Sequence, residues 1–549
     1  MKMFVENRPK LFVVEQWRSA FTRAPLVLVV RVAALLAVYV VLQSWLRQSA
    51  HLTANEYELP ILTPSLLGRL FLSPVAILLG VAALRFRYLF RSWSSLESGQ
   101  VMRMVAGGLI GINVWMFAGY DFNYYYNQAH LVDRLLLVIL GVSALWRPAF
   151  ILPFLWLTFA LAWQFDYPLQ WQFSWTALDM PLRELTLIGA AFVVYVITAH
   201  WRVSEVMLLG VSLFASSYFW SGIGKLLLGW WAHPFIHLLL PAGYAHGWVS
   251  SIAPATVGAL TEFLARFSLP NMAFTLMVEL GALLVLWHRR LTLVWLVGCI
   301  CLHTGIVLVS GIAFWMWITL AALFILGFRR ISQLEPNVLY SRGSMALSVV
   351  LIGGGPLWFR PVSLAWYDTP VTYTYRLIGY GASGSAYILP SRMFSLYSDM
   401  LTFGNFGYLD PEPRIHNLVW GVTLDRATAD ALVRVNTPEQ LTEAERRFGQ
   451  IEFQPERAQL FDVFVSRFIG NYNRRFHDTT AWPSLQAPGH LLSVKRPPVY
   501  EGQEPIASVA VIRITWLFAD RQVQTVRELV VRHISLPDTQ QSAGEETQR

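Results

Sequence analysis

The chain has 549 residues, of which 55 % are hydrophobic and only 14 % are charged. Soluble proteins carry about a quarter charged residues, so this composition excludes an ordinary soluble protein and indicates a membrane protein. The net charge of +8 is spread over short loops without a concentrated basic stripe, which argues against a nucleic-acid partner.

Apolar runs of bilayer-spanning length fill the first two-thirds of the chain. We therefore expect residues 1–360 to form an α-helical polytopic domain with about eleven spans, in contact with the lipid bilayer. The first run has no small-residue cleavage site, which predicts a retained helix. The expected spans lie near 25–46, 66–84, 104–119, 132–146, 148–165, 184–200, 204–224, 271–287, 291–310, 312–328 and 344–359.

Basic residues gather in alternate connections between these runs, for example from Lys2 to Arg23, from Arg85 to Arg103, and at Arg289 and Arg290. The positive-inside rule places the N-terminus and these connections in the cytoplasm. An odd number of spans then puts the C-terminal region on the opposite side. We expect a protein of the bacterial inner membrane with an extracytoplasmic C-terminal domain.

The segment 230–268 is apolar but is interrupted by Pro234, Pro241, Pro254 and several glycines. This pattern predicts half-helices that lie in the outer interface or re-enter it. Irregular backbone at membrane depth must be shielded by protein or line a cavity. The segment is therefore expected to roof a pocket.

Composition becomes that of a soluble protein after Arg360, which predicts a second domain at 361–537. Alternating residues at 371–376 and 509–516 predict strands, and we expect a mainly-β domain of the β-sandwich type. One helix is expected near 438–449, opened by Thr437. The polar tail 538–549 is expected to be disordered.

Three ionisable residues stand alone in apolar runs, where a charge is costly and needs a reason. Lys225 follows Gly222 at the outer end of its span. It either extends its amine to water or serves as a partly desolvated base. Glu279 either bonds two helices or takes part in catalysis. His303 is either a satisfied core residue or a functional one.

A fourth candidate, His130, precedes the expected span at 132–146 and is surrounded by polar residues. It belongs either to a wet interfacial loop or to a functional site. Cys299 and Cys301 are interpreted as packing thiols. Because no spacing typical of a metal site is found, no metal is expected.

Several motifs follow one another in a characteristic order. They are Tyr218-Phe219, Ser221-Gly222, Lys225-Leu226 and Trp230, then Glu279-Leu-Gly281, then His303 with Gly311 and Phe314, then Arg392-Met-Phe-Ser395 with Gly407-Tyr-Leu-Asp-Pro411. Their order resembles the vitamin K-dependent γ-glutamyl carboxylase family and its bacterial HTTM-domain relatives. The resemblance covers residues 204–411 well and the earlier spans only as a general pattern.

The resemblance implies a membrane enzyme, a lyase or carboxylase, that uses reduced vitamin K or menaquinol with O2 and CO2. A lysine deprotonates the quinol, and oxygenation then yields a strong base that removes the γ-proton of a peptide glutamate before carboxylation. Lys225 matches that lysine, and His130, His303 and Glu279 are the other implied catalytic residues. The residues implied in binding the quinone are Tyr218, Gly222, Trp230, Phe314 and Arg392.

The chain departs from the family at two places. Gly224 stands where the family often has a second lysine, and residues 172–179 lack the family's outer-face histidine. His130 has a similar local setting two spans earlier. Two alternatives therefore stay open: a quinone-linked peptide-maturation protein without carboxylation, or a non-enzymatic membrane receptor or assembly factor whose β domain binds a partner.

Overall fold

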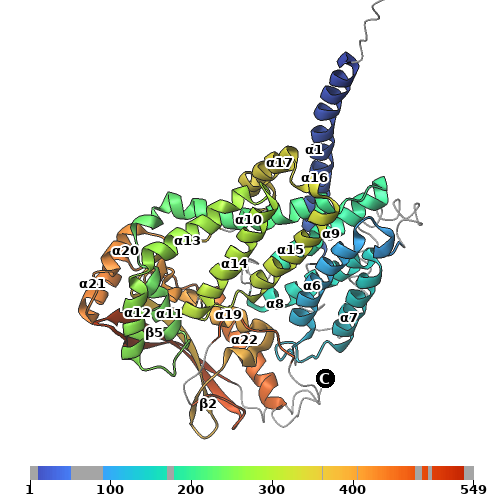
Figure 1. Cartoon of the computed structure of the whole chain (residues 1–549). Coiled ribbons are helices and arrows are strands. Elements are labelled where there is room, and N and C mark those ends of the chain that lie inside the picture. The colour runs from blue at the N-terminus through green and yellow to red at the C-terminus, as the bar shows by residue number, and fades with distance from the viewer. Residues whose placement is uncertain are drawn as a thin grey trace, which may run out of the picture.

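Long apolar helices form most of the molecule, and an antiparallel β region lies toward its C-terminal end (Figure 1). The computed structural model describes residues 10–50, 91–120, 122–169, 179–361, 363–404, 406–475, 485–492 and 498–536. The expected span 66–84 and the expected tail 538–549 lie outside these residues.

Among the described residues, six helices are long and apolar enough to cross a bilayer. They are residues Leu26–Ser49 of α1 (Lys10–Ser49), α6 (Gly99–Ala118), Pro148–Phe165 with α8 (Ile151–Asp166), α9 (Asp179–Thr198), α10 (Val203–Leu228) and α14 (Arg289–Ser310). A seventh span is formed if α12 (Pro254–Ala265) and α13 (Ser268–Gly281), bent by 64°, cross together. These helices indicate an integral membrane protein.

Three further helices occupy expected spans but are less suited to crossing a bilayer. The helices α7 (Leu131–Trp146) and α17 (Arg342–Gly353) have 16 and 12 residues. A span needs about 20 residues. The 20-residue α15 (Trp315–Leu334) carries Arg329 and Arg330. The described residues thus support six or seven of the expected spans.

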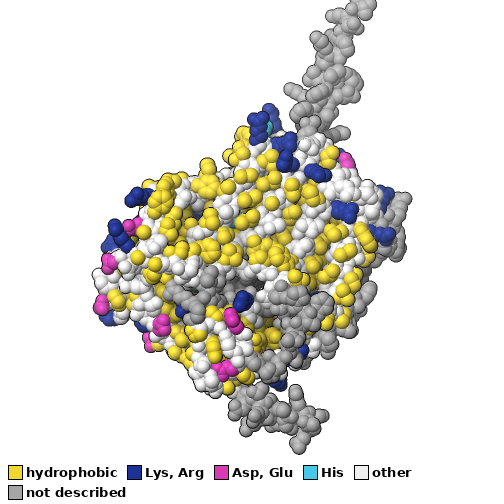
Figure 2. Space-filling model, turned by 60° about the horizontal axis from the view of Figure 1, so that its bottom comes forward, with side chains coloured by type: hydrophobic (Ala, Val, Ile, Leu, Met, Phe, Trp, Pro, Cys, Tyr) yellow, Lys and Arg dark blue, Asp and Glu magenta, His cyan; other side chains and the backbone are white. Residues whose placement is uncertain are grey.

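The helices differ in how much of their surface the protein covers. Only 22 % of the apolar window of α1 and 28 % of that of α14 are buried, against 83 % for α10. Large side chains such as Leu135, Met277 and Val294 are exposed, and Figure 2 shows a broad area of hydrophobic side chains on one face. Extended apolar surface of this kind marks contact with lipid. Among the described candidate spans, α9 and α10 are consequently the most enclosed by protein.

Two glycines shape the C-terminal part of α10. At Gly222, a Cβ atom would lie 3.0 Å from the Cβ atom of Glu279, so the missing side chain lets α13 approach α10 closely. The helix ends at Gly229, whose φ of +76° is a left-handed conformation that glycine adopts easily. The hydroxyl of Tyr367 donates to the carbonyl of Leu228 and satisfies this helix end.

The segment after α10 consists of short pieces, as its sequence predicts. It contains the 3-10 turns η4 (Trp230–Ala232) and η5 (Ile236–Leu238), then α11 (Leu239–Ala245) and α12. The other short helices are α16 (Pro336–Leu339), α18 (Gly355–Trp358) and α19 (Ser398–Phe403), and the other 3-10 turns are η1 (Trp93–Ser95), η2 (Pro148–Phe150), η3 (Tyr167–Leu169), η6 (Ala282–Leu284), η7 (Ser391–Tyr397), η8 (Gly407–Leu409) and η9 (Leu418–Trp420).

One antiparallel sheet forms the β region, in the order β3-β2-β5-β6. Its strands are β3 (Ala386–Ile388), β2 (Val371–Gly381), β5 (Ile506–Ala519) and β6 (Gln522–Ser535), while β1 (Tyr367–Asp368) pairs with β4 (Val422–Thr423). Both strands expected from alternation are confirmed. The expected helix is confirmed as α21 (Pro438–Phe448), whose first turn is capped by the Thr437 side chain.

The expectation of a mainly-β sandwich is wrong for the described part of this region. Helices α20 (Arg426–Leu432), α21 and α22 (Pro455–Arg474) accompany the sheet. The helix α22 packs against β5 and β6, with Phe464 and Phe468 in the same core as Val509 and Val511. A helix covers the sheet face where a sandwich would need a second sheet. The region is therefore a mixed α and β structure.

Candidate functional site

A buried ion pair lies where α10 ends. Nζ of Lys225 is 2.6 Å from Oε1 of Glu279 and 2.8 Å from the carbonyl oxygen of Leu364, to which it also donates. Lys225 is 7 % exposed and Glu279 is 5 % exposed. The amine therefore does not extend to water, and the structure brings two of the candidate residues into direct contact.

Two tryptophans face the same ammonium group. The ring centroids of Trp230 and Trp366 lie 5.7 Å and 5.9 Å from Nζ of Lys225, within the range of cation–π attraction. Trp230 belongs to η4, whereas Trp366 precedes β1. The site thus forms at the junction between the membrane helices and the C-terminal region.

Two turns before Lys225 on α10, a second polar contact is buried. The hydroxyl of Tyr218 lies 2.6 Å from Nε2 of His303 on α14. In the part of the chain that the structure describes, Nδ1 of His303 and Oε2 of Glu279 are buried without a hydrogen-bond partner. These two atoms retain the capacity to bond a ligand.

Aromatic side chains surround the Tyr218–His303 contact. Tyr218 lies 5.4 Å from Trp295 and 5.6 Å from Trp317, measured between ring centroids. Phe314 lies 4.8 Å from the ring of His303 by the same measure. The candidates Tyr218, His303 and Phe314 therefore share one apolar environment, which excludes water and strengthens electrostatic interactions.

A close contact explains why residue 224 is a glycine. A Cβ atom at this position would overlap Oγ of Ser363, in the segment that carries Leu364. The chain around Ser363 would have to move before a lysine could stand at position 224.

Asp368 is a member of the site that sequence reasoning missed. It is buried in β1, near enough to Lys225 for the ammonium charge to act on its carboxylate. Burial raises the pKa of Asp368 to about 7, although the indoles of Trp230 and Trp366 and the nearby Lys225 charge oppose this change. The only sequence signal is a tryptophan two residues before an aspartate, which alone is too common to single out.

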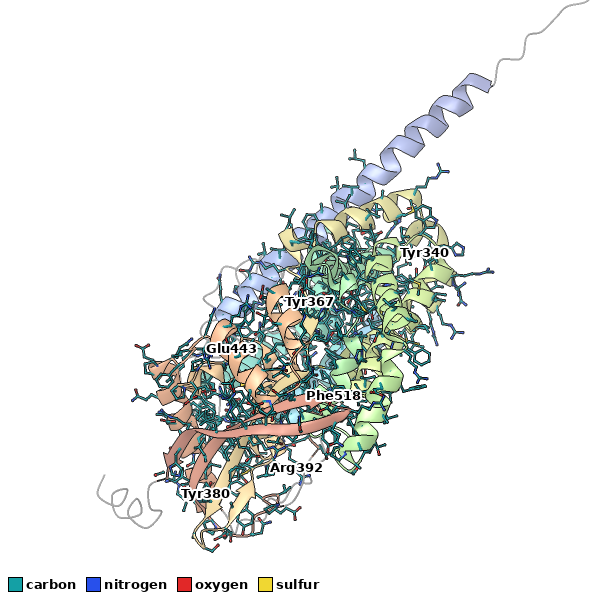
Figure 3. All side chains as sticks on the ribbon, turned by 90° about the vertical axis from the view of Figure 1, so that its left-hand side faces the viewer. Tyr340, Tyr367, Tyr380, Arg392, Glu443 and Phe518 are labelled. Carbon is teal, nitrogen blue, oxygen red and sulfur yellow. The ribbon has the colours of Figure 1, made fainter. Side chains whose placement is uncertain are left out.

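Two expected site residues lie elsewhere. His130 is buried at the start of α7, with Nε2 at 2.8 Å from the side-chain nitrogen of Gln164. No described contact joins it to Lys225, and Figure 1 shows α7 at the far side of the helices from α13. Arg392 is exposed in η7, and Figure 3 shows it well apart from Tyr367. Most of the segment 172–179 lies outside the described residues.

A pocket of about 120 Å³ lies between the sheet on one side and the end of α11 with the turn after it on the other. Its lining includes Tyr244, His246, Thr374, Arg376, Phe394 and Trp516, but not Lys225. The guanidinium of Arg376 lies 5.7 Å from the ring centroid of Trp516. Burial lowers the pKa of His246 to about 4, so its ring is neutral at physiological pH. The segment 230–268 therefore does line a pocket, at a place other than the lysine site.

Among the described residues, no group of three or more His, Cys, Asp or Glu side chains is placed to hold a metal ion. Cys299 is buried and Cys301 is exposed, and both are free thiols. No protein-family model, curated protein or solved structure matches the chain. Function must therefore be argued from the geometry of the site.

Proposed function

We propose that this protein is a membrane enzyme in which Lys225 deprotonates a reduced quinone, as the resemblance to the vitamin K-dependent γ-glutamyl carboxylases implies. The observation that carries the proposal is the burial of Lys225 against Glu279 among aromatic rings. A lysine that only anchored a helix end would extend its amine to water. This one is held inside the protein.

A base must be neutral before it accepts a proton, and the geometry offers a route. In a dry site a charged pair is costly, so the proton of the Lys225 ammonium can pass to Glu279 to leave a neutral amine and a neutral acid. The neutral amine then takes a proton from the quinol hydroxyl. The ammonium that forms is stabilised by the rings of Trp230 and Trp366.

The surroundings suit a planar apolar substrate. The rings of Trp230, Tyr218 and Phe314 offer apolar faces, and the unbonded atoms of Glu279 and His303 can bond to oxygen atoms. Water exclusion is needed if oxygenation of the quinol produces a strong base that removes the γ-proton of a peptide glutamate. O2 and CO2 would be co-substrates of that reaction.

The proposal includes an arrangement in the membrane. About eleven spans in residues 1–360 would leave the N-terminus in the cytoplasm of a bacterium and residues 361–537 outside the inner membrane. The site at the junction of the two regions would then be open to peptides from the outer side. The position of Leu364 and Trp366 beside Lys225 supports a shared role for both regions.

One observation favours the related function without carboxylation. His130 is paired with Gln164 and Asp133, away from Lys225. A quinone-linked peptide-maturation protein would use the lysine site without that histidine. The pocket beside Arg376 favours, in addition, a role of the C-terminal region in binding a partner, which the receptor or assembly alternative requires.

Quinol epoxidation by the purified protein tests the proposal. The protein is supplied with reduced vitamin K or menaquinol under oxygen, with a glutamyl peptide and labelled CO2 present. We expect epoxide from the wild type and a loss of at least about 100-fold in Lys225→Ala. Arg446→Ala, a change at an exposed position of α21, is the matched control and keeps the wild-type rate.

The outcomes separate the functions. Epoxide together with labelled peptide supports the carboxylase, whereas epoxide without labelled peptide supports the related oxidoreductase. Equal epoxide from wild type and Lys225→Ala rejects Lys225 as the base. No epoxide from a folded wild type with either quinol rejects the enzyme and supports the binding function.

A further inference from the structure

Two arginines of the C-terminal region are completely buried. The side chains of Arg414 and Arg513 are 0 % exposed, although arginine seldom leaves the protein surface unless it is paired. Each has one acidic partner. Nη2 of Arg414 donates to the carboxylate of Glu452, and Nη1 of Arg513 donates to that of Asp410. These bonds leave the remaining nitrogen atoms of both guanidinium groups to be accounted for.

The remaining nitrogen atoms are donors without acceptors. Within the part of the chain that the structure describes, Nε and Nη1 of Arg414 and Nε and Nη2 of Arg513 are buried and have no hydrogen-bond partner. A guanidinium cannot accept a hydrogen bond, so only an acceptor can satisfy these atoms. A buried donor without an acceptor destabilises the fold, and a charged donor does so more strongly than a neutral one.

Both guanidinium groups lie at the turn η8. A Cβ atom at Gly407 would overlap Nη2 and Cζ of Arg414, so the missing side chain of this glycine makes room for the guanidinium. The backbone N–H of Asp410 donates to the carbonyl of Gly407 over 3.0 Å, which places the acidic partner of Arg513 at the end of the same turn. The two guanidinium groups therefore border one short stretch of backbone.

The sheet adds hydroxyl groups beside Arg513. Tyr375 of β2 lies opposite Arg513 of β5, so both side chains are on the same face of the sheet. Thr515 is on that face as well, two residues along β5. The hydroxyls of Tyr375 and Thr515 are also buried without a hydrogen-bond partner. Burial raises the pKa of Tyr375 to about 12, so its hydroxyl keeps its proton and can donate it to an acceptor.

We propose that Arg414, Arg513 and Tyr375 bind a single chloride ion, which links the turn η8 to the sheet. A chloride ion only accepts hydrogen bonds, whereas a buried water molecule also has hydrogens that need acceptors of their own. Nε and Nη2 of Arg513 form one edge of the guanidinium plane, and such an edge holds an anion through two parallel bonds. The complete burial of both arginines favours an ion of one atom over a larger anion such as phosphate.

The charges around this site also favour an anion. Glu452, the partner of Arg414, is 21 % exposed and accepts a second bond from the ring of His416. Solvent screens this carboxylate more than it screens the buried guanidinium of Arg414. Arg527 of β6 adds a third guanidinium, which donates to Glu445 and keeps a buried, unbonded Nε. The inference does not depend on the proposed function, because it uses none of the residues around Lys225.

Equilibrium dialysis of the full-length protein in detergent measures the ion directly. The probe is radioactive chloride in methanesulfonate buffer at constant ionic strength, so that only the anion changes. We expect the wild type to bind one chloride per chain with saturation. In Tyr375→Phe, which keeps both ion pairs, the affinity should fall by at least about 10-fold, because a hydrogen bond to a charged group is lost.

A second tyrosine of the same strand provides the matched control. The ring of Tyr380 lies 6.4 Å from that of His533, measured between centroids, away from the arginines. Tyr380→Phe should therefore bind chloride as the wild type does. Arg513→Lys keeps a positive charge beside Asp410 but removes the guanidinium edge, so its binding should be lost.

Urea unfolding in the same buffers gives a second measurement. A ligand that binds only the folded state raises the unfolding midpoint as its concentration increases. The wild-type midpoint should therefore rise with chloride, and that of Tyr375→Phe should rise less at equal concentrations.

Absence of saturable chloride binding to the folded wild type overturns the inference and leaves water as the partner of the guanidinium groups. Equal affinities of wild type, Tyr375→Phe and Arg513→Lys place the ion elsewhere and overturn it as well. If neither variant folds, the wild type decides alone, and a midpoint that does not respond to chloride overturns the inference.

Discussion

The membrane region and the C-terminal region each bury an ion pair, and the two pairs differ in the cation. In the C-terminal region Arg513 of β5 pairs with Asp410, and both side chains are fully buried. In the membrane region Lys225 pairs with Glu279. A guanidinium keeps its proton at any physiological pH, whereas an amine can release it. The arginine pair can therefore only link two segments of the chain. The lysine pair can also take part in proton transfer.

The surroundings of the two pairs are similar. Arg513 lies opposite Tyr375 in the sheet and 5.5 Å from the ring centroid of Tyr373. Burial raises the pKa of Asp410, and the charge of Arg513 opposes this change. That pair ties β5 to the residue after η8. Both pairs contain buried polar atoms without a hydrogen-bond partner, namely Nε and Nη2 of Arg513 and Oε2 of Glu279, so the cation is what distinguishes them.

The largest expected effect comes from breaking the structural pair. Asp410→Ala leaves the buried guanidinium of Arg513 without its partner, which should lower the free energy of unfolding by about 3–5 kcal/mol. Urea unfolding of the C-terminal region in detergent measures this loss. The same change in the membrane pair, Glu279→Ala, should have a smaller effect, because Lys225 still donates to the Leu364 carbonyl and still faces two aromatic rings. Equal losses from both variants would contradict the distinction between the pairs.

Lys225→Arg sharpens the comparison, since it turns the membrane pair into a copy of the structural one. The positive charge and the contact with Glu279 are kept, so unfolding should change by less than about 1.5 kcal/mol. Quinol epoxidation should fall by at least about 100-fold, because a guanidinium cannot act as the base. Arg446→Lys is the control with the reverse change at an exposed position. Near-wild-type epoxidation by Lys225→Arg would rule out proton transfer through this side chain.

Sequence reasoning located the membrane pair because burial of charge leaves a visible pattern. Lys225, Glu279 and His303 stand out as single ionisable residues in apolar runs. The structure places them along α10, with Glu279 bonded to Lys225 and His303 bonded to Tyr218 two turns away. Asp368 could not be found in this way. It lies in a region of soluble composition, where an aspartate is ordinarily exposed. It is buried because β1 packs against β4, η5 and α20 beside the end of α10.

Similar reasons explain the fold predictions. The alternating side chains at 371–376 and 509–516 predicted the strands β2 and β5, and the capping residue Thr437 predicted the helix α21. The helix α22 was overlooked although Phe461, Phe464, Val465 and Phe468 recur at helical spacing and are buried. The polar setting of His130 was visible, but its partner Gln164 comes from another helix and could not be read locally.

The smallest of these effects concerns stability against pH and distinguishes Asp368 from the structural carboxylates. Its pKa is about 7 in the folded protein, above the ordinary value near 4 in an unfolded chain. Between these values the folded state binds more protons, so this group lowers stability as the pH rises. Compared with Asp368→Asn, the wild type should therefore lose about 2 kcal/mol between about pH 5 and pH 7. Urea unfolding of both proteins at several pH values measures the difference, from which other acids such as Asp410 cancel. A constant difference would mean that Asp368 stays charged throughout this pH range and that its burial does not raise its pKa.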